Sequence, residues 1–110
     1  MSHPFQVYGA ALGLVSALRS VLDGLMKSDR ALADQLRRAA SSVVLNIAAG
    51  NRRAGRDRLQ FFRIAAGSAA EVWAALDVAR AWGMVGAAQE AEAELDRVLA
   101  MLWRLTHRRG

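Results

Sequence analysis

Apolar residues recur every three or four positions along most of the chain, the spacing that places them on one face of an α-helix. Short polar or glycine-containing segments interrupt this pattern around residues 27–29, 50–56 and 83–86. The pattern predicts four helices, with these expected limits: after Pro4 to about Met26, after Asp29 to about Ala49, near Arg56 or Asp57 to about Trp82, and after Gly86 to about Leu105.

Several positions bear on where these helices end and how they pack. Ser28 or Asp29 is suited to cap the second helix, because a short side-chain oxygen can accept a hydrogen bond from an N–H of the first turn. Gly50 stands where helices commonly end in a left-handed residue, so we expect it to be a C-cap. Gly67 and Ser68 form a small-residue patch inside the third helix, where another backbone could come close.

The short links predict the fold class. Consecutive long helices joined by short links lie side by side in opposite directions. We therefore expect one all-α domain over residues 1–110, an antiparallel up-down-up-down four-helix bundle. The first helix carries two apolar stripes, so it should touch two or more neighbours. The 54% apolar content, although partly Ala, also suggests surface shared with another copy of the chain.

Positive charge is concentrated near the link between the second and third helices. The chain has a net charge of +5, and its bases are all Arg except Lys27. In an up-down bundle this link lies at the same end as the C-terminus, with Arg104, Arg108 and Arg109. Clustered Arg side chains match phosphates and give salt-dependent affinity for nucleic acid. The candidate phosphate-binding residues are Arg37, Arg52, Arg53, Arg56, Arg58 and Arg63.

Two features limit that interpretation. A solvated surface with an Arg bias from genome composition explains the same charges without a ligand. No aromatic residue lies within the basic link, so stacking on single-stranded bases has little support from the sequence.

The residues for enzyme chemistry are missing. The chain has no Cys, its two histidines are His3 and His107, and no spacing resembles a metal site. Neither a nucleophile elbow nor a phosphate-binding loop is present. We therefore expect no catalytic residue, no metal and no cofactor. The longest apolar run, residues 7–18, is shorter than the roughly 20 residues of a membrane span, which favours a cytoplasmic protein.

Polar residues interrupt the apolar faces of the second and third helices. Buried polar groups must be hydrogen-bonded, so we expect a network that fixes the register of the helices. Its candidate members are Gln35, Arg38, Asn46, Ser68 and Glu71, with Glu71 bridging to Arg38 or Asn46. The alternative is a small-molecule site between helices built on Asn46 and Glu71.

Three motifs carry a resemblance to a known family. They are the segments 35–43 (QLRRAASSV), 46–50 (NIAAG) and 61–71 (FFRIAAGSAAE). In this order they resemble the four-helix bundle proteins encoded in 23S rRNA intervening sequences. The same fold family includes the accessory variability determinant of diversity-generating retroelements. The family motif usually reads N-I-A-E-G, whereas this chain has Ala49 at the position of that Glu, so the role of that carboxylate does not carry over.

The resemblance implies an up-down four-helix bundle that assembles as a homopentamer. It leaves three functions to compare: binding of structured RNA or other nucleic acid through phosphate contacts, a protein-interaction adaptor such as an accessory subunit that docks a reverse transcriptase, and the small-molecule site described above. The first is favoured because the Arg-rich end offers a matching surface.

Overall fold

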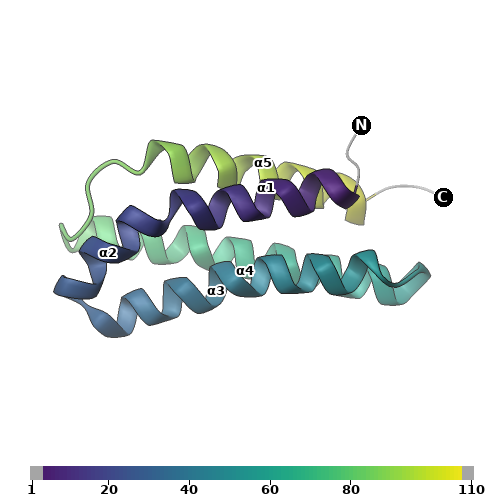
Figure 1. Cartoon of the computed structure of the whole chain (residues 1–110), viewed down its shortest axis with the longest axis horizontal. Coiled ribbons are helices and arrows are strands. Elements are labelled where there is room, and N and C mark those ends of the chain that lie inside the picture. The colour runs from purple at the N-terminus through teal and green to yellow at the C-terminus, as the bar shows by residue number, and fades with distance from the viewer. Residues whose placement is uncertain (1–3, 108–110) are drawn as a thin grey trace.

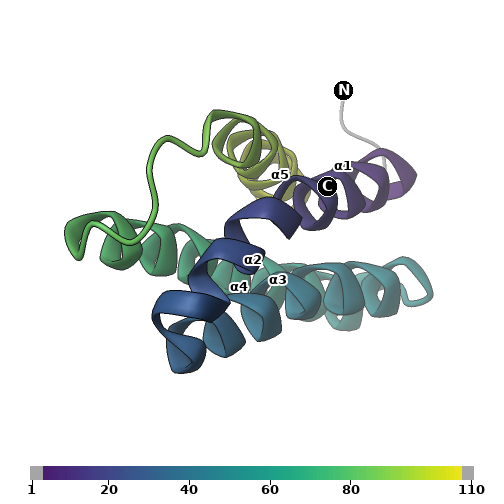
Figure 2. The ribbon, with the colours of Figure 1, turned by 60° about the vertical axis from the view of Figure 1, so that its left-hand side comes forward.

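The computed structural model describes residues 4–107, and these form five α-helices and no strand. The helices are α1 (Pro4–Ala17), α2 (Arg19–Ser28), α3 (Arg30–Asn51), α4 (Gly55–Ala81) and α5 (Gln89–Thr106). The predicted all-α class is confirmed, with five helices in place of four. They form two layers, α1 beside α5 and α3 beside α4 (Figures 1 and 2).

The extra helix arises because the first predicted helix is broken at Leu18. The segments on either side meet at a bend of 42°. Leu18 is fully buried, and its N–H donates to the carbonyls of both Leu14 and Val15, so the chain tightens locally. The bend lets α1 pack on α5 and α3 while α2 packs on α3. The wide apolar face is thus divided among several neighbours within one chain, as expected.

Gly50 is not the left-handed C-cap that the sequence suggested. It lies inside α3, is buried, and packs against Phe62, the largest fully buried side chain. A Cβ at this position would lie 2.6 Å from Phe62 Cε1, so the close approach of α4 requires glycine. Positive φ angles occur instead at Gly55 (61°), where α4 begins, and at Gly83 (72°), just after α4 ends.

Of the two N-cap candidates, Ser28 and Asp29, it is Asp29 that caps α3. Its carboxylate accepts a hydrogen bond of 3.0 Å from the backbone N–H of Leu32, in the first turn of α3. Gly67, by contrast, has nothing within 4 Å of the place where a Cβ would be. No other element among residues 4–107 therefore approaches Gly67, which faces solvent, whereas Ser68 of the same patch contacts α3.

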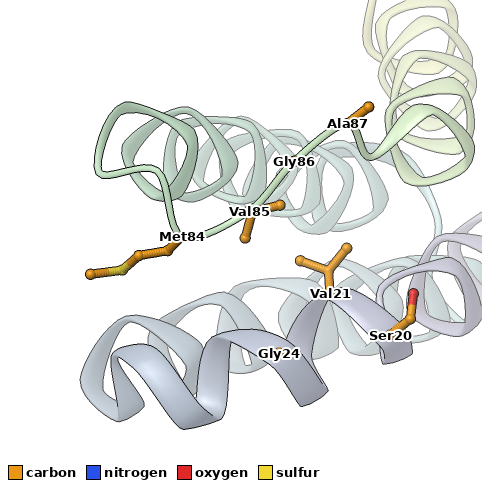
Figure 3. A pocket seen from close by; sticks show the side chains of 7 residues that line it. All are labelled: Ser20, Val21, Gly24, Met84, Val85, Gly86 and Ala87. Carbon is orange, nitrogen blue, oxygen red and sulfur yellow. The ribbon is translucent and has the colours of Figure 1, made fainter.

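The link between α4 and α5 runs past α2 (Figure 2). A hollow of about 260 Å³ between them is lined by Ser20, Val21 and Gly24 of α2 and by residues 84–87 of the link (Figure 3). None of these lining side chains carries a charge, and Ser20 supplies their one hydroxyl group.

Within the described residues, no single helix is long and apolar enough to cross a membrane. The bent pair of α1 (from Phe5) and α2 meets the length and composition criteria only when the two are taken together.

Candidate nucleic-acid interface

The link between α3 and α4 forms one end of the molecule. α3 ends and α4 begins there, and α5 also ends on this side (Figure 1). Arg52, Arg53 and Arg56 come from this link and are exposed. Arg104, in the last turn of α5, is exposed as well. Arg108 and Arg109 lie outside the described residues. We call residues 52–58 the basic link.

Two arginines of the basic link bind the chain itself. Arg58 donates from Nε to the carbonyl of Gly50 (3.2 Å) and from Nη2 to that of Asn51 (3.3 Å). Arg53 donates from Nη1 to the carbonyl of Ala49 (3.1 Å). These carbonyls belong to the last turn of α3, where backbone acceptors lack helical partners and the helix dipole is negative. The side chains of Arg53 and Arg58 therefore cap the C-terminal end of α3.

Arg53 also lies over an aromatic ring. Its guanidinium carbon is 4.5 Å from the centroid of Phe61, a cation–π distance. Phe61 follows the basic link by a few residues and is half-buried. The pairing holds the Arg53 side chain in place, and it brings an aromatic ring to a surface where the sequence placed none.

The remaining candidate arginines are spread along the helices. Arg63 is exposed on α4, about 10 Å along the helix axis from Arg56. Arg37 is exposed on α3, about 22 Å along the axis from Arg52. It lies beside Asp34 and Arg38, around a shallow hollow of about 300 Å³. The structure thus groups Arg52, Arg53, Arg56 and Arg58, extends toward Arg63, and leaves Arg37 apart.

A smaller polar network than expected joins α3 to α4. Asn46 donates from Nδ2 to the backbone carbonyl (2.8 Å) and to Oγ (3.0 Å) of Ser42. Ser42 Oγ in turn lies 2.8 Å from Ser68 Oγ across the helix pair. Ser42 was missed by the sequence reasoning, although its place four residues before Asn46 puts the two on one helix face.

The other three candidates lie outside this network. Gln35, Arg38 and Glu71 are exposed, and among residues 4–107 their side chains make no hydrogen bond or ion pair. The expected bridge from Glu71 to Arg38 or Asn46 is therefore not formed. Exposure explains the difference, because a solvated carboxylate loses no hydration by staying unpaired. Asn46 already binds Ser42, so the structure does not assemble Asn46 and Glu71 into a ligand site.

At the opposite end, ionic contacts join α4 to α5. Arg80 pairs with Glu92 of α5 and with Asp77 one turn earlier on α4 (3.2 Å). The hydrogen bonds that Arg80 donates to Glu92 first, and to Asp77 second, raise the pKa of Arg80 above its ordinary value. These residues were not singled out from the sequence. Opposite charges in separate helices reveal a contact only once the register of the helices is known.

The basic end carries a second exposed aromatic group that the sequence reasoning missed. Trp103 and His107, one turn apart near the end of α5, stack with ring centroids 4.4 Å apart and planes inclined by 11°. Both residues are exposed. Both residues come from the C-terminal end of α5 and its cap, so an analysis limited to the residues of the basic link could not locate them at this end of the molecule.

No group of three or more potential metal-ligating His, Asp or Glu side chains comes together within residues 4–107. Acidic side chains instead collect on α5, with Glu90 and Glu92 in its first turn. They favour that helix electrostatically, because its N-terminus carries the positive end of the dipole. Acidic side chains thus gather near the α4–α5 link, at the end opposite the basic link, although the α2–α3 junction with Lys27 and Arg30 lies at that end too (Figure 1).

Comparisons with known proteins extend these observations. The fold is similar to the crystal structure of a protein of unknown function from the S23 ribosomal protein family of Bacteroides thetaiotaomicron, with a TM-score of 0.83. That match covers 94% of this chain and 96% of the other at 16% sequence identity, which shows a shared fold alone. No curated protein matches the chain. The family model of the 23S rRNA-intervening sequence proteins matches residues 4–104, from the start of α1 into the last turn of α5, and the chain therefore belongs to that family.

Proposed function

We propose that this protein binds structured RNA or other nucleic acid, without catalysing a reaction, through the basic link and by phosphate contacts. The observation that carries the proposal is the grouping of Arg52, Arg53 and Arg56, all exposed, at one end of the molecule. Arg guanidinium groups match phosphate oxygens and release counterions when they bind a polyanion.

The internal contacts of the basic link support this proposal. Because Arg58 closes the end of α3, the turn that carries Arg52 and Arg56 is held without using those two side chains. Among residues 4–107 neither the Arg52 nor the Arg56 side chain makes a hydrogen bond or ion pair. The guanidinium groups of Arg52 and Arg56 thus remain available to a ligand. Because the link is already held in place, binding costs less conformational entropy.

The decisive experiment compares two charge reversals of equal size. One variant carries Arg52→Glu, Arg53→Glu and Arg56→Glu in the basic link. The matched control carries Arg19→Glu, Lys27→Glu and Arg30→Glu, which are exposed on α2 and at the start of α3. Both changes alter the net charge equally, so only the position of the charge differs.

We expect the basic-link variant to lose affinity for RNA and the control to retain most of it, measured by fluorescence anisotropy at several salt concentrations. Wild-type affinity should fall steeply with salt. Circular dichroism checks that both variants are folded. Equal affinities of the two variants would show that the basic link is not the binding surface.

We further infer that the protein acts as a homo-oligomer, and the family resemblance implies a pentamer. The outer face of α4 supports self-association, since Ile64 and Val78 are exposed there. In a five-fold ring the basic link would be repeated five times, which would multiply weak phosphate contacts. Light scattering tests this directly: a pentamer has five times the chain mass of 11.9 kDa.

The alternative function is that of a protein-interaction adaptor, for example an accessory subunit that docks a reverse transcriptase. The same exposed apolar side chains of α4 favour it, because exposed apolar patches commonly mark protein contacts. Co-purification with such a partner, together with no affinity for RNA at physiological salt, would support the adaptor and overturn the nucleic-acid proposal.

A further inference from the structure

Trp103 and His107 form an ordered aromatic pair on the surface of α5. Trp103 is 60% exposed. The His107 ring stacks on the Trp103 ring, with the two ring centroids 4.4 Å apart. The His107 ring is itself held, because Nδ1 lies 2.9 Å from the carbonyl of Trp103 and 3.0 Å from Thr106 Oγ1. The two rings thus form a fixed platform, which we call the aromatic platform.

The platform continues a groove between α4 and α5. A hollow of about 310 Å³ is lined by Ala70 and Trp73 of α4 and by Asp96 and Leu99 of α5. Trp103 follows Leu99 by one helical turn, so it extends the α5 wall of this groove in the direction of the C-terminus.

Arg63 extends the opposite wall. It precedes Ala70 by two helical turns, and residues seven apart lie on the same face of a helix. α4 and α5 run in opposite directions (Figure 1). Arg63 precedes Ala70 on α4 and Trp103 follows Leu99 on α5, so both lie on the side of the groove that leads to the basic link. The structure therefore brings an exposed aromatic ring and exposed cations to the same end.

We propose that the aromatic platform stacks an unpaired base of a single-stranded nucleic acid, while Arg63 and the basic link hold its phosphates. The inference rests on the proposed nucleic-acid function and adds the form of the ligand. Every base presents a π-face to an aromatic ring, but in a duplex those faces are covered by neighbouring base pairs. A surface that bound phosphates alone would require no exposed Trp side chain.

Charge complementarity selects this occupant over an apolar protein segment. Trp82 is more exposed than Trp103, at 72%, but it belongs to a stretch, residues 67–100, whose charge is net negative. Trp103 instead lies in the basic terminal turn of α5, next to Arg104. Asp96, the carboxylate of the groove, is about 10 Å behind Trp103 along the helix, so the phosphate chain should leave the platform toward Arg63.

The test uses the full chain and the variants Trp103→Leu and Trp82→Leu, the second serving as a matched control at the acidic end. The probes are a single-stranded oligouridylate and an RNA duplex with the same number of phosphates. Stacking on one base implies that Trp103→Leu weakens binding of the single strand about 5- to 150-fold. Its affinity for the duplex, and both affinities of Trp82→Leu, should stay at the wild-type value.

Each other outcome is decisive as well. Unchanged single-strand affinity in Trp103→Leu, or an equal loss for the single strand and the duplex, overturns the stacking inference. In that case the reversal of Arg52, Arg53 and Arg56 reports separately on the nucleic-acid function, which stands if that variant still loses affinity. If the wild-type protein binds neither probe at low salt, both the function and the stacking inference are wrong.

Discussion

Replacement of Gly50 by Ala tests the packing of α3 on α4 most directly. The added Cβ would lie 2.6 and 2.8 Å from two ring carbons of Phe62 and 3.3 Å from Phe61 Cβ. Phe62 is 1% exposed and part of the core, so its ring cannot move into solvent. Overpacking of this kind costs about 1–3 kcal/mol. The better helix propensity of Ala recovers less than about 1 kcal/mol, because Gly50 is one residue from the end of α3.

The expected net loss is therefore about 1–2 kcal/mol, which lowers the melting temperature by about 4–8 °C per kcal/mol in a domain of this size. Gly67→Ala is the matched control. It makes the same chemical change inside α4, where nothing lies within 4 Å, so it should raise the melting temperature. Both variants are measured by thermal and urea unfolding at one protein concentration, since association would shift both transitions.

A further variant isolates the contact. In a Phe62→Leu background the ring that Gly50→Ala would meet is absent, so the cost of that substitution should shrink, which a double-mutant cycle measures. Equal effects of Gly50→Ala and Gly67→Ala, or an unchanged cost in the Phe62→Leu background, would refute the argument that close approach of α4 requires Gly50.

Four smaller predictions concern contacts that hold the helices. Asp29→Ala should destabilise the protein by about 0.5–2 kcal/mol in urea unfolding, and Asp29→Asn by much less, because Asn also caps a helix. Ser68→Ala should cost about 0.5–1.5 kcal/mol, the usual net value of one hydrogen bond; no loss would mean that Ser42 is satisfied by water. Arg58→Ala should cost about 1 kcal/mol and Arg58→Lys should restore only part of it, since a single ammonium does not reproduce the two-pronged guanidinium contact. Glu92→Gln should lower the melting temperature at low salt, with the difference shrinking at about 1 M salt. Because the pKa of Arg80 is raised from an already high value, the Arg80 cation persists at every pH below that pKa and is lost only in strong alkali.

The sequence predicted what depends on local chemistry. Helical periodicity located the helices, and the short side chain of Asp29 identified its own cap, because both effects act within a few residues. Gly50 shows the limit of such reasoning. A glycine near a helix end is compatible either with a left-handed C-cap or with close contact to another helix. At Gly50 the reason is the contact with the Phe62 ring, which exists only once α4 has folded back onto α3.

The break at Leu18 was unpredictable for a similar reason. Neither Pro nor Gly marks it, and the apolar stripes of α1 and α2 are continuous in sequence. A straight helix would direct its whole apolar face at one line of neighbours, whereas the bend directs α2 onto α3 and leaves α1 beside α5. Burial of the two stripes against different helices therefore determines the bend, and this is a property of the whole fold.

The candidate interface shows that the number of arginines in a sequence does not say which of them are available to a ligand. Six arginines look equivalent in the sequence, but the side chains of Arg58 and Arg53 donate to carbonyls of the last turn of α3, whereas the side chains of Arg52 and Arg56 do not. A cation that already binds backbone acceptors has less to gain from a phosphate, and its removal lowers stability as well as charge. Loss of RNA affinity in an Arg58 variant would therefore be ambiguous. If a variant with Arg52→Gln and Arg56→Gln lost affinity for RNA while its melting temperature stayed unchanged, these two arginines would bind RNA without contributing to the stability of the fold.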